Sequence, residues 1–294
     1  MLPSRPADVT EVSAELLRQH PLPHHDDGDG KRGRGQVLVI GGSRVTGGAV
    51  LLAATAALRA GAAKLQVATV STVAPSLMTA LPEALVVGLP ETEDGAIDAA
   101  HAPEIERHIT EADAVLVGTG ALDADGSAEV LRNVLKLVTD DAVVVIDAIA
   151  TQAIPEHDDA IRRRAGRVVA IPNEGEWADL GFGAPATCVA DEARRFGATL
   201  ACRGDDTWLA GPGSGEGPFR HAGGGVGLAT SGSGDVAAGL IAGLAARGAD
   251  PLTAALWGVH AHAQAGRRLA DRIAPVGYLA RELLAEIPQQ LDAG

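Results

Sequence analysis

The amino-acid sequence predicts a layered α/β fold in which a mainly parallel sheet lies between helices. Two observations predict it. Seven short apolar runs, most of them ending at Gly, Asp, Asn or Pro, occur along the chain, and helical patterns separate most of these runs. Nearly continuous apolar runs are typical of strands that are buried on both faces of a parallel sheet. Alternation of strands with helices is typical of right-handed crossover connections.

The elements follow in chain order. The predicted parallel strands span 36–42, 64–70, 83–90, 113–120, 142–150, 167–173 and 198–204. The predicted helices between them span 47–62, 102–112, 127–141 and 186–198. After Asp206 the pattern changes: 207–212 and 217–224 flank the Gly-rich turn GPGSGEG and predict an antiparallel pair at the edge of the sheet. Two long helices close the chain, from about Ser233 and from about Asp250, where Asp250 and Pro251 are a favourable N-cap and first-turn pair.

The bulk composition predicts one cytoplasmic domain. The chain has 294 residues and 46% hydrophobic content, which is enough for a sizeable core. We predict a lead-in helix and loop over 1–35 and a single catalytic domain over 36–294. The net charge of −14 disfavours nucleic acid and anionic membranes as partners. The sequence shows no run long enough for a membrane span and no secretory layout at its start, and two cysteines imply no disulfide framework.

The segment ATSGSGDVAAGL, from Ala229, is the strongest chemical signal. Gly232 and Gly234 flank Ser233, and Asp235 falls in the first turn of the predicted helix. A helix N-terminus has unpaired N–H groups and partial positive charge, and glycine lets an anion approach the backbone closely. A carboxylate beside such an anion hole suits a base that deprotonates a hydroxyl facing a phosphoryl group. The alternative is a plain cap at Ser233 with an acid that complements the helix dipole.

Other polar and Gly-rich turns follow predicted strands at the same edge of the sheet. The first is Gly41–Ser43 with the helix entrance at 47–49, and another contains Gly118 and Gly120. Ligands of open α/β sheets bind at such strand ends, although a plain strand-to-helix turn explains the first equally well. Asn173 and Glu176 carry oxygen atoms that suit Mg²⁺, and the alternative is a helix N-cap.

Several other functional classes are excluded or weakened. The sequence holds no GxxxxGK[ST] and no well-placed GxGxxG, which argues against P-loop and Rossmann sites. His260 and His262 lie two apart on a helix and point to different faces, so they do not share a metal and are expected to serve packing or surface roles. His24, His25, Asp26 and Asp27 are expected in a solvated loop, and Cys188 and Cys202 in the core.

An ordered set of motifs resembles one known family over nearly the whole chain. The segment SGSGD resembles the Gly-x-Gly-Asp signature of the ribokinase-like superfamily. The set GKRGRGQVLVIGGS, GGAVLLAATAALRAGA, PEALVVGLPE, DAVLVGTGAL, VVVIDAIA, AIPNEGEWADL, LACRGDDTWLAGP, GLATSGSGDVAAGLIAGLAARG and VGYLARELLAEIP resembles the ADP-dependent NAD(P)H-hydrate dehydratases. These repair enzymes remove water from damaged nicotinamide cofactors.

The resemblance implies a ribokinase-like three-layer sandwich and a set of site residues. Asp235 would be the catalytic base. Nucleotide, ADP or ATP, would bind at Arg203, Gly204, Thr207, Ser231, Gly232, Ser233 and Gly234. Hydrated NADH or NADPH (NADHX or NADPHX) would bind at Gly42, Ser43, Gly48, Ala49, Gly118, Gly120, Asn173 and Asp235. Asn173 and Glu176 would hold Mg²⁺ through water. A homotetramer is also implied.

The chain departs from the family pattern at several positions. Arg203 stands in place of the usual lysine, Ser231 in place of glycine and Gly225 in place of asparagine. No tyrosine precedes Gly48, and VIDAIA lacks a second aspartate. Two alternatives therefore stand beside the dehydratase: a small-molecule kinase of sugar or thiazole-alcohol type, and a nucleotide-binding relative that has lost catalysis.

Overall fold

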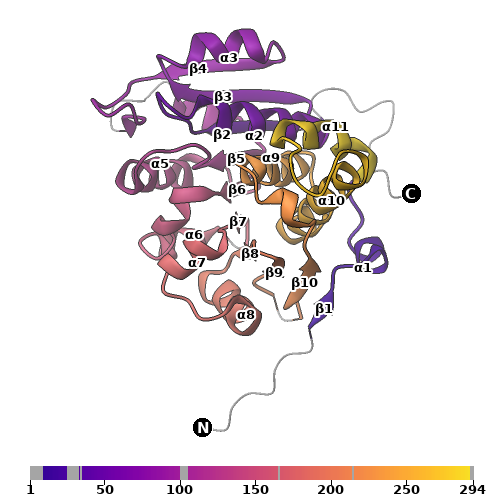
Figure 1. Cartoon of the computed structure of the whole chain (residues 1–294). Helices are drawn as coiled ribbons and strands as arrows, with labels where there is room; N and C mark the ends of the chain where they lie inside the picture. Colours follow the sequence, from indigo (N-terminus) through magenta and orange to yellow (C-terminus); the bar gives the residue numbers. More distant parts are fainter. Residues whose placement is uncertain are drawn as a thin grey trace.

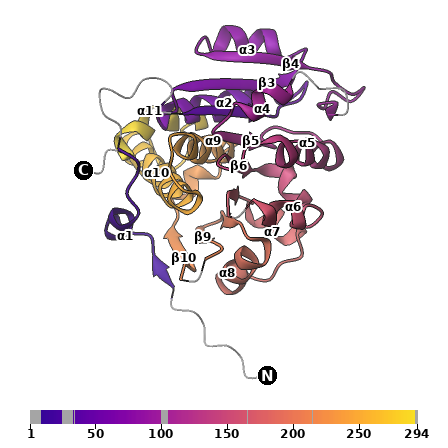
Figure 2. The same cartoon turned by 180° about the vertical axis from the view of Figure 1, so that it is seen from behind.

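A computed structural model describes residues 9–24, 33, 35–99, 105–164, 166–213 and 215–291. The predicted α/β class is confirmed: a ten-stranded sheet runs through the molecule, with helices on both faces (Figures 1 and 2). The strands are β1 (Thr10–Glu11), β2 (Gln36–Ile40), β3 (Lys64–Val70), β4 (Ala84–Leu89), β5 (Ala114–Val117), β6 (Val143–Ile146), β7 (Val168–Ala170), β8 (Thr199–Cys202), β9 (Asp206–Ala210) and β10 (Phe219–Ala222).

The helices of the described residues lie on the two faces of this sheet. They are α1 (Ala14–Gln19), α2 (Gly47–Arg59), α3 (Ala74–Ala80), α4 (Glu106–Thr110), α5 (Ala124–Leu137), α6 (Asp158–Arg163), α7 (Glu174–Asp179), α8 (Pro185–Phe196), α9 (Ser233–Ala246), α10 (Pro251–Arg272) and α11 (Ala280–Gln290), with 3₁₀ turns η3 (Ala148–Ala153) and η4 (Val226–Leu228). Among the described helices, none is long and apolar enough to cross a membrane.

The sheet order is β1-β10-β9-β8-β7-β6-β5-β2-β3-β4, and β9 alone among these strands runs antiparallel to its neighbours. The antiparallel pairing of β9 and β10 agrees with the sequence pattern. This pair is not the edge, however, because the two-residue strand β1 pairs with β10 in parallel. His25, Asp26 and Asp27, expected in a loop of the lead-in segment, lie outside the described residues.

Alternate residues of the central strands enter two separate cores. Val37 and Val39 of β2 face the core beneath α2, α9 and α10, whereas Leu38 and Ile40 face the core beneath α5 and α8. This alternation follows from the period-two geometry of a strand. Because both faces are covered, the strands read as continuous apolar runs in the sequence.

The abundant Ala and Gly residues allow α2 and α9 to pack at very short range. A Cβ on Gly239 would lie 1.9 Å from the Ala53 carbonyl oxygen, and a Cβ on Gly243 would lie 2.4 Å from that of Ala57. Helix α9 is buried on nearly all of its sides. This position explains why its sequence lacks a polar face, and it delivers the N-terminus of α9 to the centre of the sheet edge.

Candidate active site

The site lies where the strand order reverses. From β2 the chain continues to β3 and β4 on one side, and β5, β6, β7 and β8 follow on the other side of β2. The carboxyl ends of β2 and β5 therefore border the switch point at which open α/β sheets bind ligands. Gly41–Gly42 follow β2, and Gly118–Gly120 follow β5.

The two glycine turns are in direct contact. The Gly42 N–H donates to the Thr119 carbonyl over 2.8 Å, and Gly42 has a φ of +78°. A Cβ on Gly120 would lie 2.8 Å from that of Ala49, so the helix entrance packs against the second turn. Gly48 is exposed, with open space where a side chain would begin. Ser43 is fully buried, with its hydroxyl 2.5 Å from that of Thr46, and therefore holds the turn internally.

Three side chains from distant elements converge on the first turn of α9. The turn follows the N-cap Gly232, which has a φ of +88°. The Thr119 hydroxyl donates to Oδ1 of Asp235. The Ser233 hydroxyl lies 2.9 Å from Nε2 of His262.

Arg203 is the third of these side chains. A Cβ on Gly234 would lie only 2.8 Å from Nη1 of Arg203, so the guanidinium rests on the backbone of the turn. The turn thus carries one carboxylate, one hydroxyl and an adjacent cation.

The electrostatics of the turn suit a base beside an anion hole. Burial raises the pKa of the Asp235 carboxyl, and the Thr119 hydrogen bond and the charge of Arg203 oppose that rise. A carboxylate with a raised pKa is a stronger base when ionised. Burial lowers the pKa of His262 to about 3, so its ring is neutral where the protein would work. The cation beside the first turn of α9 is therefore Arg203 and not His262.

Asn173 and Glu176 occupy the first turn of α7, and both cap it. Oδ1 of Asn173 accepts from the Glu176 N–H over 3.0 Å, and Oε2 of Glu176 accepts from the Asn173 N–H over 2.9 Å. This reciprocal pair is a capping box. The backbone of Asn173 also forms an isolated parallel β-bridge with that of Arg203. This bridge places the start of α7 next to the α9 turn. A carboxylate has about four acceptor positions, so capping leaves Glu176 able to bind a hydrated Mg²⁺.

Two of the remaining predicted nucleotide residues, Gly204 and Thr207, lie on the β8–β9 side. A Cβ on Gly204 would lie 2.1 Å from Oε1 of Glu174, so the Glu174 side chain lies against Gly204, which is itself exposed. Thr207 is buried on β9, opposite His221 of β10. Ser231 is exposed at the entrance to the α9 turn.

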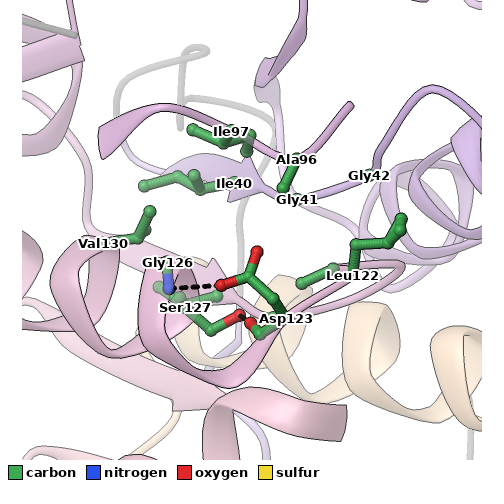
Figure 3. Close-up of a pocket in the computed structure, with 13 residues that line it drawn as sticks. Ile40, Gly41, Gly42, Ala96, Ile97, Leu122, Asp123, Gly126, Ser127 and Val130 are labelled. Atoms are coloured by element: carbon green, nitrogen blue, oxygen red, sulfur yellow. Dashed lines mark hydrogen bonds between the residues drawn. The ribbon is translucent and has the colours of Figure 1, made fainter. Parts of the chain in front are cut away.

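Beside the switch point lies a small recess that the sequence did not suggest (Figure 3). It opens between the Gly41–Gly42 turn and α5, with Ile97 and Val130 in its wall. Asp123 caps α5 by accepting from the Gly126 N–H over 2.6 Å. The recess shares Gly42 and Gly118 with the candidate substrate residues.

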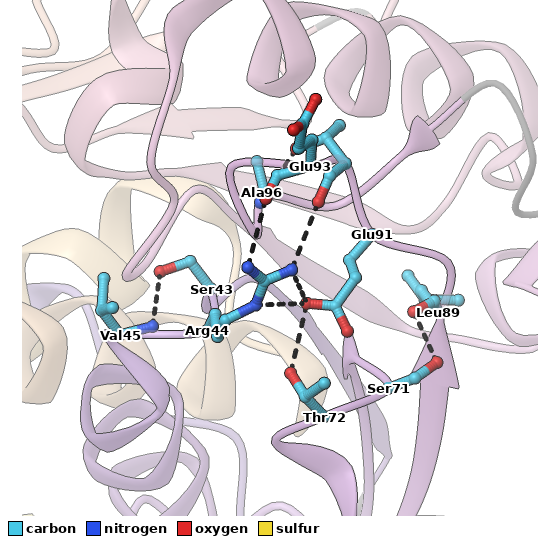
Figure 4. A network of polar contacts seen from close by, with 10 residues as sticks. Ser43, Arg44, Val45, Ser71, Thr72, Leu89, Glu91, Glu93 and Ala96 are labelled. Atoms are coloured by element: carbon cyan, nitrogen blue, oxygen red, sulfur yellow. Dashed lines mark hydrogen bonds and ion pairs between the residues drawn. The ribbon is translucent and has the colours of Figure 1, made fainter.

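Arg44 fastens the loop after β4 to the loop after β2 (Figure 4). Its Nε donates to Oε2 of Glu91 over 3.2 Å, and Nη1 donates to the Glu93 carbonyl over 3.1 Å. Thr72 donates to the same Glu91 oxygen over 3.2 Å. Ala96 of the tethered loop lines the recess, so this network holds one wall of the site region in place.

The histidines and cysteines behave largely as their spacing indicates. His260 contacts His221 at 3.2 Å, whereas His262 contacts Ser233, so the two rings point to different neighbours. The contact between His262 and the α9 turn was not anticipated from the sequence. Cys202 is buried and Cys188 is half-buried. Across the described ranges no group of three or more His, Cys, Asp or Glu side chains could hold a metal ion.

Comparison with known proteins places the chain in a family. A family model described as NAD(P)H-hydrate dehydratase matches residues 37–289. An ADP-dependent (S)-NAD(P)H-hydrate dehydratase of Xanthomonas campestris is 43% identical over 292 residues, covering 97% of this chain and 96% of that protein.

Solved structures agree on the fold. A ribokinase-like superfamily protein of Enterococcus faecalis is 26% identical, with a TM-score of 0.80 over 96% of this chain and 95% of that one. An ADP/ATP-dependent NAD(P)H-hydrate dehydratase of Bacillus subtilis, co-crystallised with ATP and Mg²⁺, is 24% identical, with a TM-score of 0.75 over 97% and 98%. The chain belongs to the NAD(P)H-hydrate dehydratase family, and its fold is ribokinase-like.

Proposed function

We propose that this protein removes water from NADHX and NADPHX with ADP or ATP as co-substrate. The observation that carries the proposal is the first turn of α9. It presents the Asp235 carboxylate, the positive end of the α9 helix dipole and the Arg203 cation together at the switch point of the sheet. Family membership supports the same activity.

The proposed chemistry begins with phosphoryl transfer. Asp235 takes the proton of the ring hydroxyl, whose oxygen bonds to the terminal phosphorus of the nucleotide, and the bond from that phosphorus to the leaving phosphate oxygen breaks. The ring nitrogen lone pair then expels the phosphate, and loss of a proton from the neighbouring ring carbon restores the double bond. With ADP, hydrate plus ADP becomes the reduced dinucleotide, AMP, phosphate and a proton.

The anion hole contributes to both steps. Hydroxide is a poor leaving group, whereas phosphate held by oriented N–H groups is a good one. We assign this role to Ser231, Gly232, Ser233 and Gly234, with the Arg203 cation beside them, and we place the rest of the nucleotide at Gly204 and Thr207. The substrate would bind at Gly42, Gly48, Ala49, Gly118, Gly120 and Asn173. Ser43 would contribute by holding the turn, since the whole residue is fully buried and its hydroxyl contacts that of Thr46.

Asn173 and Glu176 would hold Mg²⁺ through its water shell. The capping box supports this assignment because it fixes both side chains at the start of α7, next to Arg203. Bound Mg²⁺ would neutralise charge on the transferring phosphoryl group.

The decisive experiment incubates the protein with NADHX and either ADP or ATP and follows recovery of reduced-nicotinamide absorbance. Asp235→Asn preserves size and should lower kcat by about 10²–10⁴-fold, since a general base contributes that much. Equal rates for the two proteins would show that Asp235 is not the base. Phosphorylated substrate without recovery of NADH would identify a kinase instead. Nucleotide binding without any turnover would identify a relative that has lost catalysis.

We further propose a cytoplasmic homotetramer in which residues 1–35 are a lead-in and 36–294 one catalytic domain. Exposed apolar side chains support self-association: Met78 on α3 and Leu85 on β4 are 52% and 50% exposed at the outer edge of the sheet. Light scattering coupled to size exclusion measures the oligomeric state, and a monomeric mass would contradict this part of the proposal.

A further inference from the structure

Arg203 makes contacts in three directions at the centre of the site. Its Nε donates to the Ile171 carbonyl over 3.2 Å, and its Nη2 pairs with Oδ1 of Asp147 over 3.3 Å. The same guanidinium lies on the backbone of Gly234 at the start of α9. Two partners therefore set the plane of the guanidinium, and Nη1, which neither of them binds, lies against the backbone of Gly234.

Asp147 is the anchor of this arrangement. It follows β6, and its side chain is only 3% exposed, whereas that of Arg203 is 19% exposed. A buried carboxylate is costly unless it is paired, so Asp147 and Arg203 stabilise each other. Burial raises the pKa of Asp147 to about 7, opposed by the charge of Arg203, while Asp235 and Glu176 add to the rise.

We propose that Asp147 is a positioning residue that holds the Arg203 guanidinium against Gly234, where it binds the phosphoryl group to be transferred. This role rests on the proposed function, in which Asp147 has no assigned part. Asp147 is itself too deeply buried to reach the nucleotide. It acts through Arg203 by fixing the direction in which the cation presents its donors.

The geometry also accounts for arginine at position 203, where the sequence motif suggests lysine. A guanidinium offers five donors in a rigid fork, so it can bind a carbonyl, a carboxylate and a phosphate oxygen at once. An ammonium is a point charge on a flexible stem and does not have this fixed geometry. The arrangement of Asp147 and residue 203 therefore requires the forked geometry of a guanidinium at position 203.

The test measures binding of ADP and of AMP to the full chain by calorimetry, without substrate. AMP lacks the phosphoryl group that is transferred. Asp147→Asn replaces a charge-assisted hydrogen bond to the guanidinium by a weaker neutral one, so it should weaken ADP binding by about tenfold and leave AMP binding within about twofold. Equal weakening of both nucleotides, or unchanged ADP affinity in a folded variant, would overturn the proposal.

Three further variants make the test more specific. Arg203→Lys should show the same selective loss for ADP, and the double variant should be no weaker than the singles, because the two side chains act as one unit. Additive losses would contradict the proposal. Glu156→Gln is the matched control: Glu156 pairs with Arg132 over 3.0 Å on the surface, and its loss should change neither nucleotide.

The pH dependence gives a second readout. Arg203, Asp235 and Glu176 are the charged groups that act on Asp147. ADP affinity of the wild type should fall below about pH 7 more steeply than that of Asp147→Asn, since titration of ADP itself is common to both. Identical profiles would count against the role of Asp147. If the wild-type protein bound no ADP, the proposed function itself would be contradicted. Failure of the role of Asp147 can therefore be told apart from failure of the proposed function.

Discussion

Removal of the Thr119 hydroxyl should shift the acidic side of the pH–activity profile to higher pH. Thr119 is fully buried and donates to Oδ1 of Asp235, which stabilises the ionised carboxylate. Thr119→Val keeps the shape of the side chain and removes that donor. Because Asp235 must be ionised to act as a base, the rate rises with pH through its pKa, and a higher pKa shifts that rise upward.

The size of the pKa shift follows from the strength of the hydrogen bond that Thr119 donates to Asp235. A hydrogen bond to a charged group contributes about 1.5–3 kcal/mol, and one pKa unit corresponds to about 1.4 kcal/mol, so the shift should be roughly one to two units. Burial of Asp235 already acts in the same direction, and Arg203 remains to oppose it.

The assay is kcat/KM for NADHX at saturating ADP across the acid to neutral range. Thr119→Ser retains the hydroxyl and should follow the wild-type profile. A valine variant whose midpoint coincides with that of the wild type, or lies below it, would refute the assignment of Thr119 as the donor that tunes Asp235.

Three further outcomes are expected. Gly239→Ala should destabilise the protein by about 1–3 kcal/mol, because its Cβ would lie 1.9 Å from the Ala53 carbonyl oxygen; an unchanged urea midpoint would contradict this packing. Protons bind His262 more tightly in the unfolded chain (pKa about 6.5) than in the fold (about 3), so stability should fall as pH drops through that window. His262→Gln should make that fall shallower, and equal slopes by pH-dependent denaturation would argue against a buried neutral ring. Glu176→Gln should raise the Mg²⁺ concentration for half-maximal rate by about tenfold or more. A change in melting temperature alone would leave Glu176 only as a helix cap.

Features that depend on neighbouring residues were predictable from the sequence. The apolar strands, the start of α10 at Asp250 and Pro251, and the alternative reading of Asn173 as an N-cap all appear in the structure. Each arises from periodicity or from side-chain-to-backbone contacts within one turn, which spacing encodes directly. The family motifs also predicted that the strand ends at Gly42 and Gly118 belong to the site.

Only the tertiary structure showed which side chains act on the α9 turn. Thr119 and Asp235 are 116 residues apart, Ser233 and His262 are 29 apart, and Asp147 and Arg203 are 56 apart. Strand β1 gave no pattern because it has two residues and is held by pairing with β10. Local sequence therefore determined where the acid and the glycines lie. The pKa of the acid and the direction of the cation depend on burial and on partners that meet only when the sheet assembles.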